Sequence, residues 1–327
     1  MSDKVSFAKA INMALDEAMA ADPNVFLLGE DVADEQGGGV FKSNVGLSAK
    51  YGVGRVRSTP ISEQAIIGAA VGAAITGMRP VAEIMFMNFL TVCMDQIVNH
   101  AAKLRFMSGG KTSVPITIRC GTGAGVGFGG QHSDMLEAWF AHVPGMKVVT
   151  ASSPADAKGL LLSAIEDDDP TLFIENIPMY AMQGAAPAPG FKIPLGKAHV
   201  RRGGDDVTVI TYGRPVLAVD AVATKLAAEG VSVEVIDLRT IAPFDRPTVL
   251  ESVARTNRAV VVHEAVQAFG VGAEISSCIH EELFGQLRGP VQRVGSKYAP
   301  VPFSPPLEKH FLYNEDEIEA AIRKTLK

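Results

Sequence analysis

Residues 59–89 read TPISEQAIIGAAVGAAITGMRPVAEIMFMNF and join a helix signal to a strand signal. Ser62 stands at the expected N-cap of the helix, because its hydroxyl can accept a hydrogen bond from a free backbone N–H of the first turn. Small apolar residues follow as far as Arg79-Pro80, which predicts the end of the helix, and residues 81–85 have the composition of a buried strand. The stretch therefore predicts a helix that leads directly into a strand of a buried sheet.

Glu63 and Glu83 are the acidic residues in this apolar run. A carboxylate at the mouth of an apolar helix is partly desolvated, which suits it to holding or transferring a proton. The same position favours an acid for a simpler reason, because a negative charge in the first turn complements the helix dipole. Position alone leaves both interpretations of Glu63 open.

The bulk properties indicate an ordinary globular protein. With 327 residues the chain is long enough for two domains with a core each, and its net charge of −6 argues against an obligate nucleic-acid partner. No stretch has the character of a membrane span and residues 1–10 lack the features of a targeting signal, so we expect no membrane partner and a cytoplasmic location. Cys93, Cys120 and Cys278 form no CxxC pair, which favours reduced thiols over disulfides or a zinc site.

Strand-like and helix-like segments alternate along the chain, and one stretch rich in Pro, Ala and Gly interrupts them. We therefore expect an α/β domain over residues 1–176, a linker over residues 177–196 and a second α/β domain over residues 197–327. Each domain is predicted to be a mostly parallel sheet with helices on both faces. The expected helices include residues 6–21, capped by Ser6, residues 90–107, and one opened by Ser153-Pro154.

Residues 121–130, GTGAGVGFGG, form an exceptionally glycine-rich loop that precedes His132. Such a loop can bring backbone N–H groups close to a ligand and can also move. Its G-x-G-x-x-G spacing is not followed by the acid that would hold a ribose, so we expect no dinucleotide site. A lone histidine is more often structural, but the preceding loop favours a functional role for His132.

Several motifs occur together and in order: TPISEQ at 59–64, EIMFMNF at 83–89, DQIVNHAAK at 95–103 and QHS at 131–133. With them the chain resembles the β subunit of the thiamin-diphosphate-dependent 2-oxoacid dehydrogenase E1 component, the family of pyruvate, branched-chain 2-oxoacid and acetoin dehydrogenases. The resemblance runs from about Ser6 to the C-terminus. It implies a transketolase-type pyrimidine-binding domain followed by a transketolase C-terminal domain.

The resemblance also implies roles for individual residues. Glu63 matches the glutamate that hydrogen-bonds the cofactor pyrimidine at N1′, and Phe89 matches the aromatic packed on that ring, with Phe86 as the next candidate. Glu30, in GED, matches an acid in a chain of carboxylates that connects two active sites. His132 matches a histidine of the substrate channel, which acts on the substrate or on transfer to the lipoyl group. Without the resemblance, Phe89 would be a core aromatic and Glu30 a solvated loop acid.

The family further has a potassium site built mostly from backbone carbonyls. Its positions match Ile116, Ala164, Ile165, Asp167 and Asp169. Relatives often carry Asn before the proline, where this chain has Asp169 in EDDDP. If that ligand is a main-chain oxygen, we expect the difference to be tolerated. The cation remains an implication of the resemblance.

The chain contains no Gly-Asp-Gly, the motif with which thiamin-diphosphate enzymes hold the diphosphate through Mg²⁺. The resemblance therefore implies an α subunit that supplies the magnesium ligands in an α2β2 heterotetramer. It also implies a lipoyl acyltransferase (E2) as a second partner.

These observations predict an oxidoreductase subunit that is active only with its α subunit. It would decarboxylate a 2-oxoacid, pyruvate or branched-chain, and transfer the acyl group to lipoyl-E2. An acetoin dehydrogenase β subunit, or a related acyloin-forming enzyme, is the alternative. A self-contained transketolase-like enzyme and a non-catalytic assembly subunit are the other classes that the fold allows.

Overall fold

The computed structural model describes residues 4–327 and divides into two compact units. The first unit contains the chain up to Thr122 together with residues 139–195, and the second contains residues 123–138 and 196–327. The glycine-rich loop and His132 thus belong to the second unit, although they precede the expected linker. Residues 177–195 are grouped with the first unit because Ile177, Met179 and Ile193 are buried. Composition does not reveal this burial.

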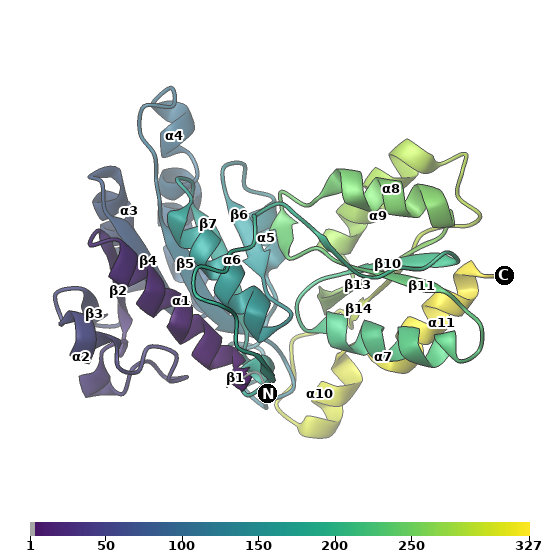
Figure 1. Cartoon of the computed structure of the whole chain (residues 1–327), viewed down its shortest axis with the longest axis horizontal. Helices are drawn as coiled ribbons and strands as arrows, with labels where there is room; N and C mark the ends of the chain where they lie inside the picture. The colour runs from purple at the N-terminus through teal and green to yellow at the C-terminus, as the bar shows by residue number, and fades with distance from the viewer. Residues whose placement is uncertain (1–3) are drawn as a thin grey trace. The chain divides into compact units, whose positions relative to one another are not determined.

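A parallel sheet forms the centre of the first unit (Figure 1). The strands lie in the order β6-β7-β5-β4-β2-β3. Their bounds are β2 (Val25–Glu30), β3 (Val56–Thr59), β4 (Arg79–Phe86), β5 (Thr117–Thr122), β6 (Lys147–Thr150) and β7 (Thr171–Asn176), and a short antiparallel pair joins β1 (Lys4–Ser6) to β8 (Gln183–Ala185).

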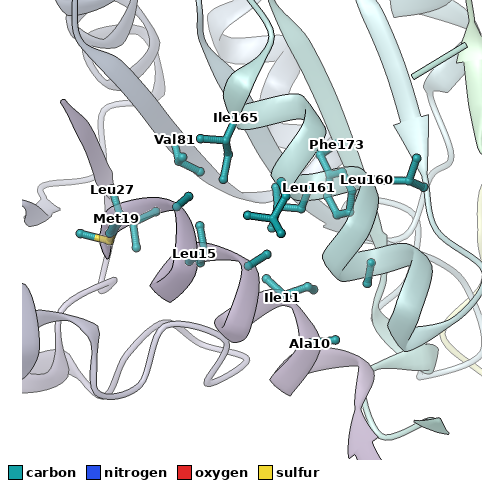
Figure 2. Packing of buried hydrophobic residues seen from close by; sticks show 14 of the residues in the cluster. Ala10, Ile11, Leu15, Met19, Leu27, Val81, Leu160, Leu161, Ile165 and Phe173 are labelled. Atoms are coloured by element: carbon teal, nitrogen blue, oxygen red, sulfur yellow. The ribbon is translucent and has the colours of Figure 1, made fainter. Parts of the chain in front are cut away.

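Helices connect these strands and cover the sheet. Helix α1 packs with α6 against the sheet through side chains such as Ile11, Leu15, Leu161 and Phe173 (Figure 2). The helical segments are α1 (Phe7–Ala21), α2 (Leu47–Tyr51), α3 (Glu63–Ile75), α4 (Leu104–Met107), α5 (Glu137–Ala141), which contains the division between the units, α6 (Pro154–Glu166), the 3-10 helices η1 (Asp34–Gln36), η2 (Met87–Cys93) and η4 (Ile177–Met179), and the π-helix η3 (Gln96–Ala101).

The predicted caps of α1 and α6 are confirmed. The Ser6 hydroxyl accepts a hydrogen bond from the Lys9 N–H at 3.1 Å, and the Ser153 hydroxyl accepts one from the Asp156 N–H at 3.1 Å. Ser62 does stand at the N-cap position of α3, but its hydroxyl makes no cap bond and instead donates to the Pro60 carbonyl at 3.1 Å. The sequence identifies the residue type that suits a cap, whereas the approach of the backbone decides whether the cap forms.

The sequence predicts that helix α3 ends at Arg79-Pro80, and this prediction is wrong. The helix ends at Ile75, Gly77 turns the chain with a φ of +98°, and Arg79 and Pro80 already pair with β2 as the first residues of β4. Proline lacks an N–H, but it is tolerated at the start of a strand.

The single helix expected over residues 90–107 is also wrong. The structure has three successive helical segments there, η2, η3 and α4. Leu90, Cys93 and Ile97 of these segments are all in the core. Periodicity over so few turns does not distinguish a regular helix from tighter 3-10 or wider π turns, so the change of helix type was not predictable.

The second unit has a five-stranded sheet in the order β14-β13-β10-β11-β9, with all pairs parallel except that of β9 with β11. Its helices follow the strands as the alternation predicted, so the expected α/β fold of mostly parallel sheets is confirmed. The elements are β9 (His199–Arg202), β10 (Val207–Thr211), α7 (Pro215–Ala227), β11 (Val233–Asp237), β12 (Thr240–Ala242), α8 (Arg246–Thr256), β13 (Ala259–Val266), α9 (Val271–Leu283), β14 (Gln292–Ser296), α10 (Pro305–Phe311) and α11 (Glu315–Thr325). Among residues 4–327, no helix has the length and apolar character that crossing a bilayer requires.

Candidate active site

The sheet of the first unit brings Glu30, Glu63 and Phe89 to one edge. Strand β2 ends at Glu30 and pairs in parallel with both β3 and β4. Glu63 begins the helix after β3, and Phe89 lies in the 3-10 helix after β4. The carboxyl ends of neighbouring parallel strands lie on the same side of a sheet, where α/β proteins place their ligands.

The charge of Glu63 affects the ionisation of Glu30 at this edge. Burial raises the pKa of Glu30, and the negative charges of Glu63 and Asp31 raise it further. Burial raises the pKa of the nearby Cys93 thiol to about 12, with a contribution from the charge of Glu63. Glu63 itself is half-buried, as the sequence had suggested for an acid at the mouth of an apolar helix. The Cys93 thiol, near Glu63, therefore stays neutral at physiological pH.

Phe89 belongs to a group of aromatic rings that contact one another. The Phe89 ring contacts Phe86 edge-on with the ring centres 5.5 Å apart, and Phe86 contacts Phe41 in the same way at 5.7 Å. Phe86 is buried in the core, whereas Phe89 is half-buried. Of the two aromatic candidates, Phe89 therefore has the greater exposed surface for a flat ligand ring.

Sequence reasoning missed a buried charge network on the central strands of this sheet. Arg119 on β5 is 1% exposed and forms ion pairs with Glu83 at 2.9 Å and with Glu175 at 2.6 Å. Tyr180 donates a hydrogen bond to Glu175 at 2.8 Å, and Asn44 donates one to Glu83 at 2.8 Å.

The pKa shifts of the network follow from this arrangement. Burial raises the pKa of Glu175, and the Arg119 charge partly offsets that effect. Burial alone would lower the pKa of Arg119, but the charges of Glu175 and Glu83 raise it. In the sequence, charged residues inside apolar strands indicate that buried ion pairs exist. They do not indicate which of these charges pair with each other.

The glycine-rich loop of the second unit is held by carboxylates of the same unit. Glu264 accepts a hydrogen bond from the Ala124 N–H at 3.1 Å, and Glu308 accepts from the N–H groups of Gly125 at 2.5 Å and Gly127 at 3.1 Å. Backbone N–H groups of such a loop can approach a ligand, but these three bind side chains of the chain itself. His132 follows this loop and is half-buried.

His263 is a buried core histidine of the second unit. Its Nδ1 lies 3.1 Å from the Ala265 carbonyl, and its ring stacks on Tyr212 with an interplanar angle of 10°. Burial lowers the pKa of His263 to about 4, so the ring is neutral at physiological pH. A neutral ring enclosed in this way serves packing.

Comparison with protein-family models gives two successive matches along the chain. Residues 3–182 match the transketolase pyrimidine-binding domain, and residues 196–318 match the transketolase C-terminal domain. The β subunit of the acetoin:2,6-dichlorophenolindophenol oxidoreductase of Cupriavidus necator is 46% identical, over 100% of this chain and 99% of that protein. The β subunit of 2-oxoisovalerate dehydrogenase of Bacillus subtilis is 42% identical, with 98% of both chains covered. Subunit β-2 of the mitochondrial pyruvate dehydrogenase E1 component of Oryza sativa is 44% identical, over 98% of this chain and 86% of that protein.

This chain belongs to the E1 β-subunit family of thiamin-diphosphate-dependent 2-oxoacid dehydrogenases. The resemblance inferred from its motifs is confirmed. A solved structure described as a split-gene transketolase, an inactive β4 tetramer, has a TM-score of 0.79 over 98% of each chain. At 22% identity that likeness concerns the fold alone.

The carbonyls that the E1 β-subunit resemblance assigns to potassium lie around the end of α6. Arg79 donates hydrogen bonds to the carbonyls of Ile165 at 3.3 Å and Asp167 at 3.1 Å, and the Ile116 carbonyl accepts one from the Thr171 N–H at 3.0 Å. Arg79 thus already binds two of these carbonyls, and a cation here would use the second lone pair of each oxygen. Within residues 4–327, no cluster of three or more His, Cys, Asp or Glu side chains is arranged to bind a metal.

Glu137 was missed by the sequence, although it lies close to His132 in the chain. It is fully buried, its Oε1 accepts a hydrogen bond from Tyr212 at 2.8 Å, and its Oε2 has no hydrogen-bond partner among the described residues. Burial raises the pKa of Glu137 to about 7. A buried carboxyl at the base of the loop therefore changes charge near physiological pH.

Replacing Glu137 with Gln should change the pH dependence of stability. Because the folded-state pKa is raised, the folded protein binds the proton more tightly than the unfolded chain. The resulting stabilisation is complete below about pH 4.5 and is lost as the pH rises to about 7. Across this window we expect the free energy of unfolding of the wild type to fall by on the order of 3 kcal/mol relative to that of Glu137→Gln. Urea unfolding at each pH measures this difference. Glu251→Gln, at an exposed position of α8, should show no such slope, and a constant difference for Glu137→Gln would contradict the assignment.

Proposed function

We propose that this chain is the β subunit of a 2-oxoacid dehydrogenase E1 that decarboxylates pyruvate or a branched-chain 2-oxoacid and passes the acyl group to lipoyl-E2. One observation carries the proposal. A half-buried glutamate, Glu63, begins an apolar helix at the sheet edge that also holds Glu30 and Phe89, in a domain of the pyrimidine-binding family.

These residues fit the pyrimidine half of thiamin diphosphate. When bound, the cofactor supplies the carbon nucleophile that attacks the 2-oxo carbonyl. The Glu63 carboxyl would hold a proton at pyrimidine N1′, and Phe89 would contact the ring face. Glu30, whose pKa responds to the charge of Glu63, would couple proton movements at Glu63 to neighbouring acids. His132 would act in the substrate channel as an acid or base.

We infer that a second polypeptide completes the site. The relatives are named as β subunits, and the sequence carries no Gly-Asp-Gly motif for Mg²⁺ and diphosphate. An α subunit in an α2β2 heterotetramer would supply those ligands, and a lipoyl acyltransferase E2 would receive the acyl group. The assembly would work in the cytoplasm.

The candidate substrates are those for which the relatives are named: pyruvate, 2-oxoisovalerate and acetoin. Acetoin is the second candidate, because two acetoin oxidoreductase β subunits, at 46% and 42% identity, align with 100% of this chain. A substrate panel on the reconstituted enzyme distinguishes these classes.

Glu63→Gln should lower kcat of the α-reconstituted enzyme by at least roughly 100-fold, because an amide cannot hold the carboxyl proton. Turnover is measured with an artificial electron acceptor and each substrate. Glu35→Gln, at an exposed position outside the proposed site, serves as the matched control and should retain full turnover. If Glu63→Gln is as active as this control, the chain is a non-catalytic subunit.

Cofactor binding should depend on the partner. Calorimetric titration with thiamin diphosphate and Mg²⁺ should give no saturable binding to the purified chain and stoichiometric binding to its complex with the α subunit. The physical reason is that the charged diphosphate lacks metal ligands on this chain. Stoichiometric binding and turnover by the chain alone would instead indicate a self-contained transketolase-like enzyme.

Potassium should stabilise the first unit if the carbonyls of Ile116, Ala164, Ile165, Asp167 and Asp169 bind it. Exchange of KCl for NaCl or choline chloride at equal ionic strength should lower Tm, by about 2–4 °C for each kcal/mol of lost binding free energy. Differential scanning calorimetry measures this shift. Equal Tm values in the three salts would contradict potassium binding by these carbonyls.

A further inference from the structure

The loop between Gly123 and Gly130 is shaped in a way that only glycine allows. Gly125, Gly127 and Gly129 have φ values of +108°, +75° and +72°, a region that other residues rarely adopt. A side chain on Gly129 would also overlap the ring of Phe303. So many glycines lower the intrinsic stiffness of the loop, and its single conformation must come from contacts outside it.

Those contacts come largely from one segment near the C-terminus, residues 300–308. Glu308 on α10 is 2% exposed, and its two carboxylate oxygens accept hydrogen bonds from Gly125 at 2.5 Å and Gly127 at 3.1 Å. Phe303 packs against Gly129, and Pro300 and Val301 pack against Gly130. This segment therefore contacts the loop along most of its length.

The start of the loop has a second attachment within the same unit. Glu264, at 3% exposure, accepts from the Ala124 N–H, and Arg214 donates to the Ala124 carbonyl at 2.5 Å. The Arg214 guanidinium also lies 4.0 Å from the Glu264 carboxylate, which balances part of its charge. We call Glu264, Glu308 and Arg214 the loop anchor. Hydrogen bonds from backbone N–H groups to a buried ionised carboxylate are the stronger kind.

The backbone of His132 is attached to the loop that the anchor holds. The His132 N–H donates to the Gly129 carbonyl at 3.2 Å, so the backbone of the histidine is tied to the same turn that Phe303 contacts. We propose that Glu308 is a positioning residue for the reaction: its carboxylate holds the glycine-rich loop in one conformation and so holds His132 in the substrate channel. The effect on catalysis rests on the proposed function, whereas the anchoring of the loop rests on the structure alone.

The test uses Glu308→Gln in the complex with the α subunit. An amide of the same size loses the charge and presents an N–H₂ group to glycine N–H donors, so the loop should loosen without leaving a cavity. Hydrogen–deuterium exchange of peptides covering residues 121–134 should accelerate by roughly 10-fold or more, while exchange in β10 and α7 stays unchanged. Transfer to a lipoyl domain should lose roughly 10- to 100-fold in kcat, with thiamin diphosphate affinity within about 2-fold of wild type.

Two further variants make the result specific. Glu308→Asp keeps the charge and should recover part of the transfer rate. Glu315→Gln changes an exposed glutamate at the start of α11 and should behave as wild type. If Glu308→Gln is not recovered folded, Phe303→Ala removes a ring that is 66% exposed and should accelerate exchange around residues 128–132 and slow transfer.

Each outcome decides the proposal. Unchanged exchange in the loop, or faster exchange with unchanged transfer, would overturn the positioning role. Loss of cofactor affinity or faster exchange throughout the second unit would show that Glu308 is merely structural, which also overturns it. If the wild-type complex turns over no 2-oxoacid or acetoin, the proposed function fails, and the exchange data still decide whether Glu308 anchors the loop.

Discussion

The parallel pairing of β2 with both β3 and β4 is the constraint on which the candidate site depends. Because parallel strands end at the same edge, it gathers Glu30, Glu63 and Phe89 from three different strand–helix connections. Burial raises the pKa of both Glu30 and Cys93, and the charge of Glu63 raises both further. Carboxyl groups whose titrations are coupled can share protons, which suits proton transfer at a bound heterocyclic ring.

The centre of the same sheet carries the buried ion pairs of Arg119. Ring contacts connect Phe89 through Phe86 and Phe41 to Tyr180, whose hydroxyl donates to Glu175 in the network. Burying charges costs desolvation energy, and removal of one partner would leave an uncompensated charge in the core. The network therefore restricts how the strands behind the site can shift, because any slip of β4 against β5 would separate Glu83 from Arg119.

Carboxyl groups have different roles in this chain according to their surroundings. In the first unit Glu83 and Glu175 pair with the Arg119 guanidinium, whereas Glu63 is half-buried at a helix start. In the second unit Glu308 binds backbone N–H groups, and Glu137 has a single hydroxyl donor and a pKa of about 7. For Glu137, burial raises the pKa more than the hydrogen bond from the Tyr212 hydroxyl lowers it.

The sequence by itself determined the α/β alternation, the caps Ser6 and Ser153, and the motifs around Glu63 and His132 that identify the family. These are local properties, since periodicity, capping chemistry and short motifs are written in neighbouring residues. Only the tertiary structure decided that Glu83 meets Arg119, that residues 87–107 change helix type, and that Glu308 reaches the loop in front of His132. Strand register and the approach of distant segments depend on the packing of the whole core, and a single sequence carries no local signal for either.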